Sequence, residues 1–137
     1  MSDKTSHEIL HPKHWKPARG YANGVAASGR MVFTGGIIGW NAECEFETDD
    51  FVGQVAQALR SIVEVLAEAG ARPEHLVRLT WYVTDKAEYL ANLKGLGAAY
   101  KEIIGRHYPA MALVQVVALV EDRAKVEIEA TAVIPQD

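Results

Sequence analysis

The sequence predicts a single α+β domain in which two amphipathic helices cover one face of a mixed β-sheet. The chain of 137 residues has the length of one domain. Two stretches repeat apolar residues with the spacing of a helix, and five shorter stretches have the composition of strands. Their order along the chain is β-β-α-β-α-β-β, which is typical of a two-layer α+β sandwich.

Residues 1–20 are expected to form an extended N-terminal arm, and residues 21–137 to form the domain. Two prolines and a glycine in the arm disfavour a regular element. His11 and His14 are three residues apart and His7 is nearby, so these three imidazoles are candidate metal ligands. A proline-containing arm holds ligands poorly, so the sequence predicts no metal site there.

The first two strands are predicted to pair with each other as a hairpin. Tyr21–Ala27 and Met31–Thr34 flank a Ser-Gly-Arg turn. Gly35 and Gly36 then end the second strand or form a bulge in it, and a loop containing Trp40 follows.

The clearest helix is expected after Asp49 and Asp50, which occupy positions suited to an N-cap and a first-turn acid. Apolar residues recur at i, i+3 and i+4 from Phe51 to Leu66, which predicts one buried face. Gly70 supplies the residue that ends the helix.

A second helix is predicted to open at Asp85, with Glu88 three residues later as a variant of the capping box, and to end at Gly105. Gly95 and Gly97 inside it cost roughly 1 kcal/mol each relative to alanine. Either close packing or a partner on that side explains them, or the helix simply tolerates them.

The remaining strands suggest a second buried surface. Leu76–Thr84 and Met111–Val120 are apolar on both faces, whereas Val126–Ile134 alternates. Because the two helices cover only one face of the sheet, the other face is expected to need a partner subunit. The apolar fraction agrees, since it is 49% before glycine is counted and average chains reach about 45–50% with glycine included.

Composition excludes several classes of function. The 14 basic and 18 acidic residues give a net charge of −4 and form no basic run, so nucleic acid is not an expected partner. No apolar stretch approaches the roughly 20 residues that span a bilayer, and the polar N-terminal residues lack the apolar core of a signal peptide. One cysteine cannot form a disulfide scaffold, and the expected location is the cytoplasm.

Candidate chemistry is sparse. Glu127 and Glu129 share one strand face, which is either solvated or enclosed by a neighbouring chain, where a carboxylate can move protons. Four large side chains either line an apolar ligand pocket or belong to the core: Tyr21, Trp40, Trp81 and Met111.

Five segments in register carry a more specific signal. They are Gly29–Gly36, Leu66–Gly70, Leu79–Asp85, Tyr108–Ala110 and Val126–Ala130. Together they resemble the RidA (YjgF/YER057c/UK114) family over most of the chain. The resemblance implies a fold like that of bacillary chorismate mutase, a homotrimer, and small-molecule clefts between its subunits. It implies no metal and no organic cofactor.

The resemblance also implies a set of site residues. Glu127 matches the acid that positions water in family members that hydrolyse enamines and imines. Met111 stands where these members carry the Arg of Pro-Ala-Arg, which binds the substrate carboxylate. The chain therefore resembles a subgroup without that Arg. The expected substrate-binding residues are Tyr21, Gly35, Gly36, Trp40, Gly97 and Met111.

Two functions remain open from the sequence. One is hydrolysis of an enamine or imine other than the usual 2-imino acids, such as a 2-aminomuconate-type substrate, with Glu127 activating water. The other is a non-catalytic trimer that binds a small metabolite or protects other proteins.

Overall fold

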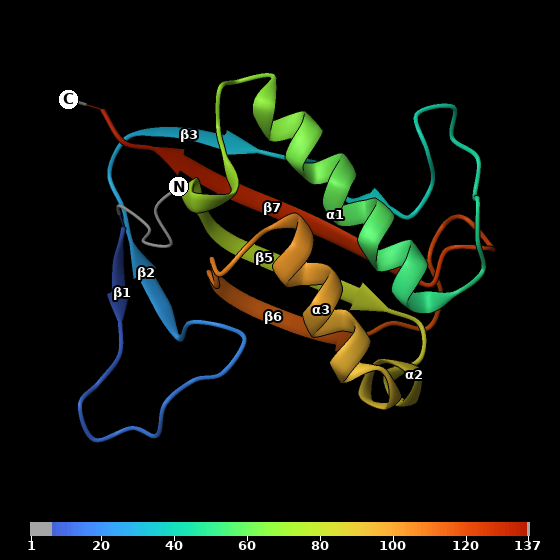
Figure 1. The fold of residues 1–137 in the computed structure, drawn as a ribbon, viewed down its shortest axis with the longest axis horizontal. Helices are drawn as coiled ribbons and strands as arrows, with labels where there is room; N and C mark the ends of the chain where they lie inside the picture. Colours follow the sequence, from blue (N-terminus) through green and yellow to red (C-terminus); the bar gives the residue numbers. More distant parts are fainter. Residues whose placement is uncertain (1–6, 137) are drawn as a thin grey trace.

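One mixed sheet with helices on one side forms the body of the protein. The computed structural model describes residues 7–136. The strands of the main sheet are in the order β3 (Arg30–Phe33), β7 (Val126–Ile134), β5 (Leu76–Val83) and β6 (Ala110–Gln115). The short strand β4 (Ile37–Ile38) pairs with β7 beside β3. Figure 1 looks onto the face of this sheet that α1 and α3 cover. This arrangement confirms the predicted α+β class.

The N-terminal region differs from the prediction in its pairing. β2 (Gly24–Ala26) pairs with β1 (Glu8–Leu10), which lies inside the predicted arm. β3 (Arg30–Phe33) pairs instead with β7 (Val126–Ile134). The predicted hairpin between β2 and β3 is therefore wrong, because each of these strands pairs with a strand farther away in the sequence. The two-stranded β1-β2 sheet stands beside the main body (Figure 1).

The first long helix, α1 (Phe51–Ala67), follows the sequence prediction closely. The side chain of Asp50 accepts the backbone N–H of Gly53 and caps the helix. The apolar face of α1 is buried in the core against β7 and α3. Gly70 has a φ of +80°, a backbone conformation that glycine adopts without strain and that ends the helix region.

The buried face of α1 also carries a polar residue, Gln54, which is fully buried. Its amide nitrogen donates to the carbonyls of Thr48 and Arg123, and its amide oxygen accepts the backbone N–H of Lys125. Each polar atom of the side chain is thus satisfied, and the loop before β7 is tied to α1.

The predicted second helix is divided into two. α2 (Lys86–Ala91) starts at the N-cap Asp85, whose side chain accepts two backbone N–H groups. The backbone leaves helical geometry at Asn92, and α3 (Leu93–Ile103) follows. A short 3₁₀ helix, Pro73–His75, leads into β5.

The central strand β5 (Leu76–Val83) lies between β7 and β6 (Ala110–Gln115), antiparallel to the first and parallel to the second. β6 ends at Gln115, five residues before the predicted end, and Val117 and Val120 after it are almost fully exposed. The predicted strand was too long because apolar composition alone does not mark where pairing stops.

The sheet face away from the helices is only partly apolar. On β5 this face carries Arg78, Thr80 and Tyr82, so the prediction of two apolar faces for that strand is wrong. Exposed apolar side chains gather instead on β3, where Met31 and Phe33 lie opposite Val133 and Thr131.

In residues 7–136 no helix is long and apolar enough to cross a membrane.

Candidate functional site

The predicted site residues fall into two groups on opposite sides of the sheet. Tyr21, Gly97 and Met111 gather at the β6 edge. Gly36 and Glu127 lie on the other side, where β4 pairs with β7. The strand order separates the groups, so one protomer does not bring Glu127 to Met111.

At the β6 edge, these residues line a cavity of about 530 Å³, which we call the apolar pocket. Its wall consists mainly of aromatic and aliphatic side chains from β5, β6 and the α2–α3 region. Besides Tyr21, Gly97 and Met111, they include Trp81, Tyr89, Leu93, Leu96, Tyr100, Tyr108 and Leu113. Among the residues that line this pocket, Arg19 is the one that carries a full charge.

Met111 belongs to this pocket because of its strand register. It pairs with Leu79, and it packs against the core on the helix side of β6. Trp81 also faces this side, and its indole N–H is buried without a hydrogen-bond partner among the described residues. The pocket therefore has mainly apolar walls with few polar groups, which is the usual composition of a small-ligand site.

Two stacked tyrosines line the apolar pocket. The rings of Tyr100 and Tyr108 lie 5.2 Å apart between centroids and nearly parallel. The hydroxyl of Tyr100 donates to the carbonyl of His107, and burial raises the pKa of this tyrosine above its usual range. Tyr100 is therefore a neutral hydrogen-bond donor that fixes the segment before β6.

On the other side of the sheet, the carboxylate of Glu127 lies against the backbone of Gly36. A Cβ added to Gly36 would stand 2.7 Å from the carboxyl carbon of Glu127, which is closer than carbon atoms pack. A Cβ at Gly35 would meet nothing within 4 Å. The half-buried carboxylate thus borders a stretch of backbone without side chains.

A bulge fixes this backbone. The hydroxyl of Thr34 donates to the carbonyl of Gly35 at 2.8 Å and accepts the N–H of Ala130 at 3.0 Å. This interrupts the pairing with β7 between β3 and β4. β3 ends at Phe33, just before the glycine pair, and the pairing with β7 resumes at Ile37 with its register shifted by one residue, which fits both the predicted strand end and the predicted bulge.

The second acid of β7 has a different partner. The hydroxyl of Tyr82 donates to Glu129 Oε1 at 2.9 Å. This hydrogen bond, with a smaller effect from burial and the neighbouring acids, raises the pKa of Tyr82. Glu129 is therefore held by Tyr82, whereas Glu127 is lodged against Gly36.

Trp40 lies in neither group. Its ring packs against Phe46 at 5.9 Å, and the guanidinium of Arg123 lies over the other ring of that pair. These contacts give Trp40 a role in holding the loop before α1.

The arm histidines do not converge. His7 Nε2 lies 3.0 Å from the carbonyl oxygen of His75, and His11 Nε2 lies 3.1 Å from that of Trp15. Within the described part of the chain, no group of three His, Cys, Asp or Glu residues is arranged to hold a metal ion.

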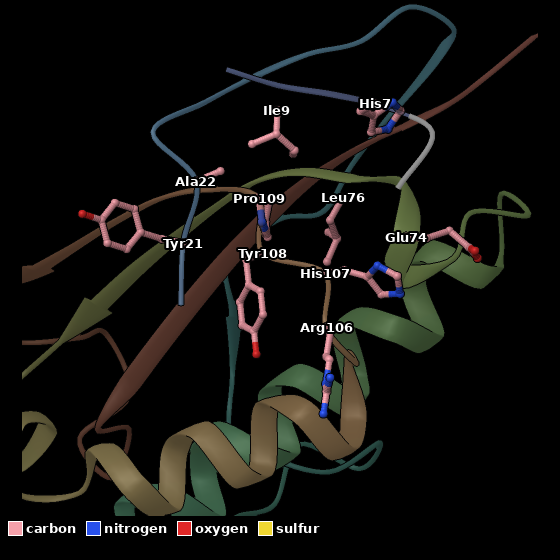
Figure 2. A pocket seen from close by; sticks show the side chains of 10 residues that line it. All are labelled: His7, Ile9, Tyr21, Ala22, Glu74, Leu76, Arg106, His107, Tyr108 and Pro109. Carbon is pink, nitrogen blue, oxygen red and sulfur yellow. The ribbon is translucent and has the colours of Figure 1, made fainter. Parts of the chain in front are cut away.

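A second cavity of about 450 Å³, which we call the polar pocket, was missed by the sequence analysis (Figure 2). It adjoins the apolar pocket, because Tyr21 and Tyr108 line both. The polar pocket adds His7, Glu74, Arg106 and His107. The segment from α3 to β6 places Arg106, His107 and Tyr108 in succession along its wall. No sequence motif marks these residues. They come from the arm, from the 3₁₀ helix that contains Glu74 and from the segment between α3 and β6, and these parts of the chain come together only in the folded protein.

Comparison with known proteins identifies relatives along the whole fold. A family model described as Endoribonuclease L-PSP matches residues 12–134. Protein DfrA of Myxococcus xanthus is 34% identical, with 97% of each chain covered. The 2-iminobutanoate/2-iminopropanoate deaminase of Salmonella typhimurium is 30% identical, over 82% of this chain and 86% of the relative.

Solved structures give the same result. The conserved Rid family protein YyfB of Yersinia pestis, described as of unknown function, has a TM-score of 0.84 and 31% identity, with 95% of this chain and 100% of that chain covered. TdcF of E. coli, solved with bound serine, has a TM-score of 0.66 and 27% identity, with 98% and 97% covered.

Proposed function

Because the chain belongs to the RidA (YjgF/YER057c/UK114) family, we propose that it is a cytoplasmic, cofactor-independent hydrolase of a small enamine or imine, with Glu127 as the group that activates water. The observation that carries this proposal is the position of the Glu127 carboxylate beside the side-chain-free backbone of Gly36. The open space is at the next glycine, because a Cβ at Gly35 would meet nothing within 4 Å, so the carboxylate stands beside backbone that a substrate can approach.

The relatives support hydrolysis of a carbon–nitrogen bond. One is named for deamination of 2-imino acids, and another was solved with an amino acid bound. The family model's description names an endoribonuclease, but a net charge of −4 without a basic run does not favour RNA as the substrate.

The reaction needs one group that both donates and accepts protons. Glu127 in its acid form protonates the enamine carbon, which converts the enamine into an iminium ion, and water then adds to the iminium carbon. The resulting carboxylate takes the proton that this water loses and passes it to the amine nitrogen. As ammonia leaves, the remaining hydroxyl gives its proton back to Glu127 and the carbonyl forms. The product is the corresponding carbonyl compound. An imine enters the same sequence once its nitrogen is protonated.

A homotrimer would complete the site. Glu127 and the apolar pocket lie at opposite sides of the sheet, so two neighbouring copies are needed to bring them together. The exposed Met31 and Phe33 on β3 supply apolar surface for such an interface. The ligand would bind in the cleft between subunits.

Met111 argues for a substrate other than a short 2-imino acid. A methionine cannot form the two parallel hydrogen bonds by which Arg holds a carboxylate. Around it, Trp81, Leu113 and Tyr21 give an apolar surface instead. We therefore expect a larger substrate with a longer apolar carbon skeleton, of which a 2-aminomuconate-type compound is one example.

The test is an activity panel on 2-iminobutyrate, 2-aminoacrylate and 2-aminomuconate with the wild type, Glu127→Gln and Glu129→Gln. We expect turnover of at least one larger substrate, a loss of about 100-fold in kcat for Glu127→Gln, and little change for Glu129→Gln. The Glu129 variant is a matched control, because it changes the same group on the same strand. Equal activity of wild type and Glu127→Gln would contradict the proposal.

The apolar pocket and Met111 also favour a second candidate, binding of a small metabolite without turnover or protection of other proteins. In that case ligands would raise the melting temperature of the protein by mass action. No product would form from any of them, and the Glu127 variant would bind as well as the wild type.

A further inference from the structure

We propose that the ligand of the apolar pocket carries an acid group at its far end, and that Arg106 and His107 bind this group in the polar pocket. The inference rests on the proposed function only in placing the reacting end of the ligand in the apolar pocket. It deepens that function by naming the substrate class: a compound with an apolar body and a distal carboxylate.

The first argument is continuity. Tyr21 and Tyr108 line both cavities, so they form the shared wall between them. Both side chains are partly exposed, Tyr21 by 44% and Tyr108 by 37%. The polar pocket is therefore the adjoining space that a ligand longer than an amino acid would reach past these two rings.

The second argument is charge. Arg106 is exposed and makes no ion pair among residues 7–136. Glu74 is the one acid among the described residues that line the pocket, and it pairs with Arg72 at 2.7 Å, so its charge is compensated. The lining charge without an ion pair is therefore the positive one of Arg106, which suits an anion.

The third argument is an unsatisfied polar atom. His107 Nδ1 is buried and has no hydrogen-bond partner in the described part of the chain. A buried polar group without a partner costs free energy, which a ligand can recover by bonding to it. Because Nδ1 is closed to solvent, the imidazole ring must turn toward the pocket before this nitrogen, in the tautomer that carries its proton, donates to a carboxylate oxygen beside the guanidinium of Arg106.

The fourth argument is that the arm closes the pocket. The hydrogen bond between His7 and the carbonyl of His75 fixes the arm over this region, and Ile9 of β1 contributes to the wall. Figure 2 shows Ile9 and His7 on the side of the pocket opposite Arg106. The β1-β2 pairing that sequence analysis missed therefore gives this cavity its second side.

These features account for the absence of an arginine at Met111. Arg19 lines the apolar pocket and Arg106 lines the polar pocket, so the two cations lie on the two sides of the Tyr21–Tyr108 wall. A compound with an acid group at each end fits this distribution of charge better than a compact 2-imino acid does.

Binding of unreactive acids tests the proposal separately from turnover. Isothermal titration calorimetry would compare hexanoate with the dicarboxylate adipate, which has the same number of carbons. We expect adipate to bind at least tenfold more tightly to the wild type. Arg106→Gln should remove most of that advantage, and Arg60→Gln on the exposed face of α1 should leave it unchanged.

Equal affinity for the two acids, or an adipate preference that survives Arg106→Gln, would overturn the proposal. Inorganic phosphate is a third arm: if it binds with the affinity of adipate and through Arg106, the pocket holds a free anion and not the end of a substrate. Failure of the proposed function gives a different pattern, since adipate would still bind through Arg106 while no enamine is turned over.

Discussion

Glu127 occupies the space that a side chain at Gly36 would need. A Cβ at that glycine would lie 2.7 Å from Glu127 Cδ, while the neighbouring Gly35 has open space at the same position. The two glycines are adjacent in sequence, but only one of them sets the position of the carboxylate.

Gly36→Ala is expected to displace the Glu127 side chain without unfolding the protein. The group that must move is the end of a flexible side chain, so the free energy of unfolding should change by about 1 kcal/mol or less. The kcat should fall about tenfold or more, because a displaced acid no longer aligns water with the substrate. Enzyme assays and urea unfolding would measure both quantities.

Gly35→Ala is the control for this change and should leave both kcat and stability close to wild type. Equal losses of activity in the two variants would show that the glycine pair acts through backbone freedom and not through the position of Glu127.

Gln54→Leu is expected to destabilise the fold by about 3 kcal/mol. The substitution removes three hydrogen bonds and leaves the carbonyls of Thr48 and Arg123 and the N–H of Lys125 without their partner. Chemical denaturation would report the loss. Gln57→Leu, on the same helix and with a single side-chain bond to Ser61, should cost less than about 1 kcal/mol. Similar losses in both variants would contradict a special role for Gln54.

Stability should fall when the pH drops below about 6.5, partly because of His75. Burial lowers the pKa of its imidazole below the ordinary value of 6.5; Glu74 opposes this shift, and Arg72 and His7 reinforce it. The unfolded chain therefore binds a proton at His75 at a higher pH than the folded chain does. Stability is fully present above that range and is lost as the pH falls from about 6.5 toward the folded-state pKa.

Melting temperatures at pH 7.5 and 5.5 would measure this effect in wild type and in His75→Asn, whose side-chain oxygen can still accept the N–H of Arg72. Between pH 7.5 and 5.5 we expect the melting temperature of His75→Asn to decrease less than that of the wild type. His14 lies in the exposed part of the arm, so the melting temperature of His14→Asn should decrease as much as that of the wild type. A pH dependence unchanged by the His75 substitution would assign the effect to other groups.

Local signals predicted more of this fold than of its site. The limits of α1 follow from Asp50 and from helical periodicity, which act within a few residues. The partner of β2 depends on a segment about 15 residues earlier, and that of β3 on one about 100 residues later, which local pattern does not reveal. The resemblance placed Met111 and Glu127 at clefts between subunits, and the strand order puts them at opposite sides of a single sheet, so a site that uses both needs a second copy of the chain.

Phe33→Asp is expected to convert a trimer into monomers that still fold. Phe33 is 63% exposed on the sheet face away from the helices, where its partner across the strand is Thr131. A charge there is harmless in a free protomer, but it would be buried without a partner in an interface. Light scattering at micromolar concentration should give the mass of three chains for wild type and of one chain for the variant. Val65→Asp, at a 41% exposed position on α1, should remain trimeric. If the wild type itself has the mass of one chain, the site must form within one protomer, and Glu127 is then too far across the sheet to act on a ligand beside Met111.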